Sequence, residues 1–204
     1  GFLAHVPGFS ARVVQCRRVD RKDWATDWKH TFPPEQVGHR FWTVPPWENA
    51  PSLPDGAIPI LLEPGLAFGT GKHATTRHCL RFLEEIAADR EAPPVSFLDV
   101  GCGSAILSIA AALLGVPRVL ALEIDPEALP VARGNVERNR FQERIRLVNG
   151  SPECCRGRFE LVAANLTAPV LLGYGEVLPG LMEENGLCIL SGILETEKPE
   201  ILGL

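Results

Sequence analysis

The sequence predicts an α/β protein with a doubly wound, mostly parallel sheet of seven strands and a short N-terminal strand and linker extension. From about residue 56 onward, short apolar runs alternate with segments of helical periodicity. Glycines stand directly after several of the apolar runs, as they do where a strand turns into a helix. Strands that alternate with helices pair in parallel through right-handed crossovers, which produces this class of sheet.

The expected elements follow one another in a regular order. We expect strands at residues 58–62, 95–100, 118–124, 145–148, 159–164 and 186–191. We expect helices at residues 75–88, 106–114, 126–139 and 170–181. In the first of these helices, Cys79, Leu83 and Ile86 recur at the spacing of one helix face. Asp125 followed by Pro126 is typical of a helix start, because aspartate caps free N–H groups and proline fits the first helical position.

Composition and charge restrict the classes of function. The chain has 204 residues, 46% of them hydrophobic, which is enough to bury one domain core. The net charge of -5 argues against a general electrostatic grip on nucleic-acid phosphates. No apolar run approaches the length of a membrane span, no signal peptide is evident, and the six cysteines form no CxxC pair. We therefore expect a cytoplasmic monomer that binds no metal, no membrane and no nucleic acid.

Residues 1–55 differ from the rest of the chain. They hold all four tryptophans and lead into a proline-rich stretch. Short strands are expected at residues 13–14 and 41–44, and one or two helical turns at residues 23–30. We place a boundary after residue 55 and assign residues 56–204 to the main domain. The missing initial methionine and the apolar end indicate a fragment, truncated at its C-terminus as well.

The strongest motif is the turn DVGCG at residues 99–103, between an expected strand and a helix. Gly101 and Gly103 permit tight backbone conformations and close approach of a ligand. Glu123 ends the next strand, where an acid accepts hydrogen bonds from both hydroxyls of a ribose. The third glycine of a dinucleotide fingerprint would fall at Ile106, whose branched side chain hinders binding of a pyrophosphate. A ligand with a ribose and no pyrophosphate is favoured, and S-adenosylmethionine is such a ligand.

Asp99 supports the same ligand, because an acid at the end of this strand can reach its amino group directly or through water. We therefore predict that Asp99, Gly101, Gly103 and Glu123 bind the cofactor. The alternative is that the glycines only form a turn and Glu123 is a solvated strand end.

A second glycine-rich segment, EPGLAFGTGKHATT at residues 63–76, precedes the first long helix. We interpret it as a lid in which Phe68 covers the ligand and the hydroxyl of Thr75 or Thr76 lies near it. Alternatively, Thr75 is the N-cap of the helix and the glycines form a hinge.

Asn165 follows another expected strand, in the segment AANLTAP. Its amide offers both a donor and an acceptor. In amine methyltransferases, a carbonyl oxygen at this position can accept a hydrogen bond from the acceptor nitrogen and direct its lone pair at the methyl group. We predict that Asn165 is catalytic and that no general base is used; the alternative is an asparagine that caps the following turn.

Together these segments resemble the PrmA family, which methylates ribosomal protein eleven of the large subunit. Residues 63–76 are similar to the family segment DPGxAFGTGTHxTT, and residues 99–105 to its glycine motif. The EIDP, NL and SGIL segments at residues 123–126, 165–166 and 191–194 resemble its DIDP, NIL and SGIL. The resemblance covers nearly the whole chain and implies a Rossmann-like methyltransferase sheet, S-adenosylmethionine as cofactor, and methylation of lysine and α-amino groups of that ribosomal protein.

By matched position, the resemblance implies cofactor contacts from Phe68, Gly69, Thr70, Thr76, Gly101, Glu123 and Asn165. It implies that residues 1–55 are the remnant of an N-terminal substrate-recognition domain plus linker, and that residues 56–204 form the catalytic domain. Three departures lie in the motifs: Glu123 replaces a family aspartate, Ala105 replaces a family glycine, and Lys72 and Ala74 replace the usual threonine and proline of the lid.

Other functions remain open on the sequence. One is a methyltransferase of the same fold with another substrate, although residues 165–168 lack the Asn/Asp-Pro-Pro-aromatic segment typical of base amino methylation. A second is a cofactor-binding domain without transfer activity. A nicotinamide dehydrogenase is disfavoured by Ile106.

Overall fold

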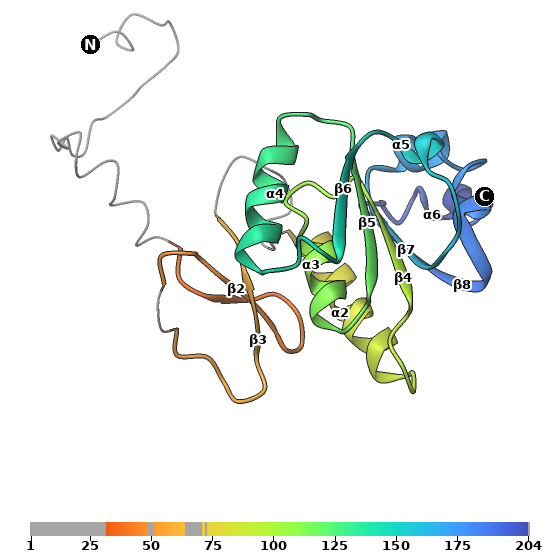
Figure 1. The fold of residues 1–204 in the computed structure, drawn as a ribbon. Coiled ribbons are helices and arrows are strands. Elements are labelled where there is room, and N and C mark those ends of the chain that lie inside the picture. The colour runs from red at the N-terminus through yellow and green to blue at the C-terminus, as the bar shows by residue number, and fades with distance from the viewer. Residues whose placement is uncertain (1–31, 49–50, 64–70, 72, 204) are drawn as a thin grey trace, which may run out of the picture. The chain divides into compact units, whose positions relative to one another are not determined.

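A computed structural model describes residues 32–48, 51–63, 71 and 73–203 (Figure 1). The chain divides into two compact units, Gly1–Phe32 and Pro33–Leu204, and every element below belongs to the second. The strand and helical turns expected before residue 31 lie outside the described residues.

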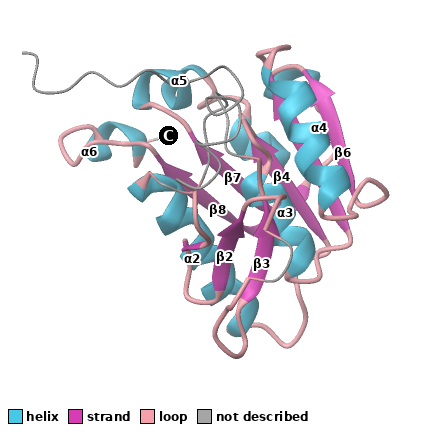
Figure 2. Ribbon diagram, turned by 90° about the vertical axis from the view of Figure 1, so that its left-hand side faces the viewer, coloured by secondary structure: helices cyan, strands magenta, loops and turns pink. Residues whose placement is uncertain are grey.

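The larger sheet has five parallel strands in the order β6-β5-β4-β7-β8 (Figure 1, Figure 2). Its strands are β4 (Ser96–Val100), β5 (Arg118–Glu123), β6 (Ile145–Asn149), β7 (Phe159–Asn165) and β8 (Met182–Ser191). The order runs outward from β4 in one direction and then resumes on its other side with β7. This arrangement confirms the doubly wound α/β class. The described part of the chain places five strands in this sheet, so the expected number of seven is not confirmed.

Helices cover both faces of this sheet. One face carries α2 (Ala74–Ala88), α3 (Ile106–Leu113) and α4 (Ala128–Arg138). The other carries α5 (Ala168–Gly173), α6 (Lys198–Ile201) and the 3-10 helix η4 (Leu178–Leu181). In β4, Phe97 packs in the first core, whereas Leu98 and Val100 pack in the second. A strand buried on both faces favours apolar side chains on both, and Phe97, Leu98 and Val100 supply them. Ser96 and Asp99 are buried polar residues of the same strand. Among the described residues, no helix is long and apolar enough to span a membrane.

Three expected helices differ in detail. The helix expected to begin at Pro126 after Asp125 begins instead at Ala128, with Glu127 as its N-cap. The helix expected at residues 170–181 is interrupted, because α5 ends at Gly173 and η4 begins only at Leu178. Glycine and proline in this stretch disfavour a continuous helix. Helix α2 has His73 as its N-cap, with the ring accepting from Thr75 N, so Thr75 lies inside the helix.

A small second sheet precedes the large one. It has the order β1-β2-β3, with β1 (Glu35–Gln36) antiparallel to β2 (Phe41–Val44) and β3 (Ile58–Leu61) parallel to β2. The strand expected at residues 58–62 therefore belongs to this sheet. Phe41 and Ile60 are fully buried in the core formed by α2 and α3.

A buried carboxylate fastens this small sheet to α2. Glu84 is only 7% exposed, and its oxygens accept from the backbone N–H groups of His39, Arg40 (2.7 Å) and Phe41 (3.2 Å). A Cβ on Gly38 would come within 2.5 Å of a Glu84 oxygen, so the turn fits closely around the carboxylate. Because a buried charge needs such partners, Glu84 fixes the start of β2 on the helix.

Candidate functional site

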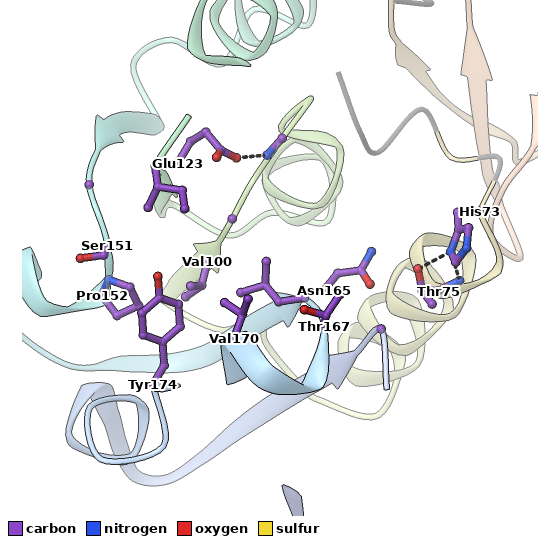
Figure 3. Close-up of a pocket in the computed structure, with 16 residues that line it drawn as sticks. His73, Thr75, Val100, Glu123, Ser151, Pro152, Asn165, Thr167, Val170 and Tyr174 are labelled. Atoms are coloured by element: carbon purple, nitrogen blue, oxygen red, sulfur yellow. Dashed lines mark hydrogen bonds between the residues drawn. The ribbon is translucent and has the colours of Figure 1, made fainter. Parts of the chain in front are cut away.

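A cavity of about 560 Å³ opens at the carboxyl ends of β4, β5, β6 and β7 (Figure 3). The strand order reverses between β4 and β7, and ligands of doubly wound sheets bind at such a point. Its volume lies within the range of small-molecule sites. The cavity is lined by His73, Thr75, Val100, Gly101, Gly103, Glu123, Ile124, Gly150, Ser151, Pro152, Asn165, Leu166, Thr167, Val170, Tyr174 and Gly192.

The glycine turn at residues 99–103 joins β4 to α3 at the floor of this cavity. Gly101 and Gly103 have φ of +73° and +52°, in the region that side chains disfavour. The N–H groups of Gly101 and Cys102 both donate to the Leu122 carbonyl at 2.9 Å. The turn is therefore tied to the neighbouring strand β5, and both predicted glycines face the cavity.

Glu123 lines the cavity beside the turn, as Figure 3 shows, although only 8% of it is exposed. Its Oε2 accepts from Gly103 N at 2.8 Å, and its Oε1 accepts from Asp125 N at 3.0 Å. A carboxylate has about four acceptor positions, so each oxygen keeps capacity for a further donor. The side chain is thus held in place while it can still accept two hydroxyl groups.

Asp99 lies behind the turn, almost fully buried, and is not part of the cavity lining. Its Oδ2 accepts from Ser108 Oγ at 2.6 Å and from Ser108 N at 3.0 Å. Burial raises the pKa of Asp99 to about 6, although the two Ser108 hydrogen bonds lower it. Because the N-cap Ala105 makes no side-chain capping bond, Asp99 caps the first turn of α3 from the adjacent strand. Its contact with the ligand stays a prediction.

Ala105 occupies a position that suits glycine. Its φ of +64° is left-handed, a conformation that is strained for a residue with a Cβ. The residue is fully buried in the core on the α3 side and does not line the cavity. The added methyl group therefore fills core space.

An apolar slot extends the cavity beyond Glu123. Ile124 is 63% exposed, and with Pro152, Val170 and Tyr174 it lines this end of the cavity, next to Ser151. Figure 3 shows Tyr174 beside Ser151 and Pro152. An exposed large apolar side chain within a cavity suits a flat apolar ligand surface. The sequence prediction missed these residues, although Ile124 and Ser151 follow strands directly.

The other end of the cavity combines Asn165 and Thr167 with the start of α2. Asn165 Nδ2 donates to Thr76 Oγ1 at 3.2 Å, which leaves the carbonyl oxygen available as an acceptor. Thr76 is 1% exposed and lies behind Asn165, whereas Thr75 lines the cavity. His73 Nδ1 is 2.7 Å from Thr75 Oγ1 (Figure 3). The predicted Asn165 therefore faces the cavity, and Thr76 supports it from behind.

Leu166 joins three of the sequence motifs. A Cβ on Gly101 would lie 2.6 Å from Leu166 Cδ2, and a Cβ on Gly192 would lie 2.4 Å from the Leu166 carbonyl oxygen. Leu166 N also donates to the Ser191 carbonyl at 3.0 Å. The glycine turn, the segment after β7 and the SGIL segment thus pack around one residue.

Some predicted residues cannot be placed. Phe68, Gly69 and Thr70 lie outside the described residues. Of the others, Gly101, Gly103, Glu123 and Asn165 line one cavity, whereas Thr76 and Asp99 are buried directly behind it.

Cys102, within the turn, is not suited to nucleophilic chemistry. Burial raises the pKa of its thiol far above neutrality, so the thiol stays protonated. In the ranges that the structure describes, no three His, Cys, Asp or Glu side chains converge as metal ligands do.

Comparisons with known proteins point to one family of methyltransferases. The model of the family "Ribosomal protein L11 methyltransferase (PrmA)" matches residues 4–203. The ribosomal protein L11 methyltransferase of Tolumonas auensis is 38% identical over 92% of this chain and 62% of its own length. That of Pelotomaculum thermopropionicum is 41% identical over 93% of this chain and 60% of its own length. The crystal structure of the ribosomal protein L11 methylase from Lactobacillus delbrueckii subsp. bulgaricus superposes with a TM-score of 0.75 at 33% identity, covering 84% of this chain and 86% of that one. The chain therefore spans about three fifths of the length of these two curated relatives.

Proposed function

The chain belongs to the PrmA family of ribosomal protein L11 methyltransferases, and on that premise we propose that it transfers methyl groups from S-adenosylmethionine to lysine and N-terminal α-amino groups of ribosomal protein L11. The observation that carries the proposal is the meeting of Glu123, the glycine turn and Asn165 in one cavity.

The donor end of the cavity fits an adenosine with a short charged tail. Glu123 keeps acceptor capacity for the two ribose hydroxyls. The slot formed by Ile124, Pro152 and Tyr174 suits the flat face of the adenine. Gly101 and Gly103, which line the cavity without a side chain, let the carboxylate-bearing tail approach the turn closely. When bound, S-adenosylmethionine supplies a methyl group that is already activated on a sulfonium.

The acceptor end has to bind and orient a neutral amine. An unperturbed lysine amine has a pKa of about 10.4, so partial desolvation in the site, or proton loss to water, must provide the free base. The Asn165 carbonyl oxygen accepts a hydrogen bond from that amine and fixes the direction of its lone pair. The side chains thus contribute proximity and orientation rather than proton transfer.

The remaining features complete the proposal. Residues 1–55 are a substrate-recognition segment with its linker, and residues 56–204 form the catalytic domain, against which β1 and β2 pack. The protein acts in the cytoplasm as a monomer, and its partner is a ribosomal protein rather than a nucleic acid. The net charge of -5 supports this choice of partner.

Two measurements on the full chain test the proposal. Calorimetry with S-adenosylhomocysteine measures cofactor binding, and radiolabelled S-adenosylmethionine measures transfer to purified ribosomal protein L11. We expect binding and transfer by the wild type, and neither by Gly101→Arg, whose folding is checked by circular dichroism. Wild-type binding without transfer to any ribosomal protein would instead indicate a cofactor-binding platform. Full-strength binding by Gly101→Arg would show that the cofactor site is placed wrongly.

A further inference from the structure

Asn135 is a fully buried polar side chain on α4 that does not line the cavity. Its Nδ2 donates to the Ser104 carbonyl at 3.0 Å, and its Oδ1 accepts from Glu63 N at 3.1 Å. Asparagine is a poor residue for a helix interior, and a buried amide is tolerated only when its polar atoms are bonded. Asn135 therefore connects two backbone segments, namely the residue after the glycine pair and the residue that follows β3 by two positions.

The peptide unit that Asn135 holds closes the glycine turn. The Ser104–Ala105 peptide presents its carbonyl to Asn135, and its N–H donates to the Cys102 carbonyl at 2.8 Å. Both ends of this peptide are therefore fixed. The unit precedes Ala105, whose φ of +64° is disfavoured and has to be maintained by its surroundings.

The same turn carries the N–H that orients Glu123. Gly103 N donates to Glu123 Oε2 at 2.8 Å, one residue before the carbonyl to which Asn135 donates. Rotation of the Ser104–Ala105 peptide would disturb both the turn and this carboxylate. Asn135 thus acts on the cavity through the turn, although it lies outside the cavity.

Asn139 provides a natural comparison one helical turn further along α4. Its Nδ2 donates to the carbonyls of Leu61 and Asn135, both at 2.8 Å, and its Oδ1 accepts from Leu61 N at 3.0 Å. It attaches the same helix to the end of β3. None of these three hydrogen bonds reaches the glycine turn.

We propose that Asn135 is a positioning residue for the cofactor, which holds the glycine turn in the conformation that binds S-adenosylmethionine. The inference rests on the proposed function, since it assigns a role within that cofactor site. Asn139 secures the helix to β3, whereas Asn135 adds the connection from the helix to the turn.

The test compares Asn135→Asp with Asn139→Asp in the full chain. Each change keeps the size and the acceptor oxygen but replaces a donor to backbone carbonyls by a second acceptor. We expect both variants to lose thermal stability, Asn135→Asp the more, because Asn135 is fully buried whereas Asn139 is only half-buried. Only Asn135→Asp is expected to weaken binding of S-adenosylhomocysteine, by about tenfold or more, because the Ser104 carbonyl then faces a carboxylate. Equal weakening by both variants, or wild-type affinity in Asn135→Asp, would overturn the inference.

A second readout does not depend on the ligand. Hydrogen exchange of the amides at residues 101–105 is expected to accelerate in Asn135→Asp and to stay at the wild-type rate in Asn139→Asp. Unchanged exchange in both would also reject the role. If Asn135→Asp does not fold, Asn135→Ala removes the donor without the repulsion and replaces it in both experiments. Failure of the wild type to bind S-adenosylhomocysteine would reject the proposed function itself, whereas the exchange rates still decide whether Asn135 holds the turn.

Discussion

The two ends of the cavity are built differently. At the donor end, Glu123, Asp99 and Asn135 are held by hydrogen bonds of 2.6–3.1 Å to the backbone or to a neighbouring hydroxyl. At the acceptor end, the ends of β7 and β8 are joined to α2 by longer contacts, from Asn165 to Thr76 at 3.2 Å and from the Ser191 hydroxyl to a backbone carbonyl at 3.5 Å. The donor end is thus held by several hydrogen bonds to the backbone, whereas β7 and β8 are attached to α2 by fewer and longer ones.

The largest expected effect concerns Asp99, the buried carboxyl behind the glycine turn at the donor end. In the folded protein the pKa of Asp99 is about 6, against 3.8 for the exposed group. The folded state therefore retains a proton that the unfolded state releases, so this group stabilises the fold below about pH 4 and loses that contribution as the pH rises through 6. Asp99→Asn removes this titration. The free energy of unfolding of the variant, relative to that of the wild type, should therefore rise by about 3 kcal/mol as the pH increases from below 4 to above 6.

Chemical unfolding of both proteins from pH 4 to pH 7.5 measures this difference. Glu127→Gln, which changes an exposed carboxylate, serves as the control for replacing a carboxylate by an amide. If the difference in free energy of unfolding between Asp99→Asn and the wild type stays constant with pH, burial does not raise the pKa of Asp99. The donor end would then be less enclosed than the burial of Asp99 indicates.

The next effect addresses the acceptor end. Asn165→Ala should lower the rate of methyl transfer by about 100-fold, because the amine loses the group that orients it. Binding of S-adenosylhomocysteine should change less than threefold. Thr76→Val, which removes only the hydroxyl behind Asn165, should give a smaller loss of rate. Equal losses of rate and affinity in Asn165→Ala would assign Asn165 to cofactor binding and remove the contrast between the two ends.

A smaller effect is expected for Glu123→Gln. The amide keeps one acceptor oxygen but presents an NH₂ group to one of the two backbone N–H donors that hold the carboxylate. Affinity for S-adenosylhomocysteine should fall by about tenfold, as judged by calorimetry. An unchanged affinity would mean that the ribose lies elsewhere, and it would leave the donor end without its principal acceptor.

The smallest effect concerns Ala105. The left-handed conformation of Ala105 costs about 1–2 kcal/mol, and Ala105→Gly relieves that strain. The same change removes a buried methyl group that stabilises the fold by about 0.8 kcal/mol. The net gain should be below about 1 kcal/mol, or a rise of a few degrees in Tm. Ala110→Gly, at an equally buried position inside α3, should instead destabilise, because it removes a methyl group without relieving strain. A loss of stability in Ala105→Gly would show that the strain is negligible.

The donor end could be predicted largely from the sequence, because its signals are local. Gly101 and Gly103 lie in the turn that follows one strand, and Glu123 ends the next strand. Their places along the sequence were therefore enough to predict that they lie close together. The role of Asn135 depends on partners 31 and 72 residues away, which no local pattern reveals. The same limit applies to the strand predicted at residues 58–62, which pairs with β2 in the small sheet, since strand pairing is decided by tertiary packing.

Helix α2 also has a mechanical consequence. Its last turns hold the small sheet through Glu84, and its first turn carries Thr75 and Thr76 at the acceptor end. Its 15 residues span about 22 Å as a stiff rod. The small sheet and the residue that contacts Asn165 are therefore attached to one helix, so that a rigid displacement of α2 would move both together.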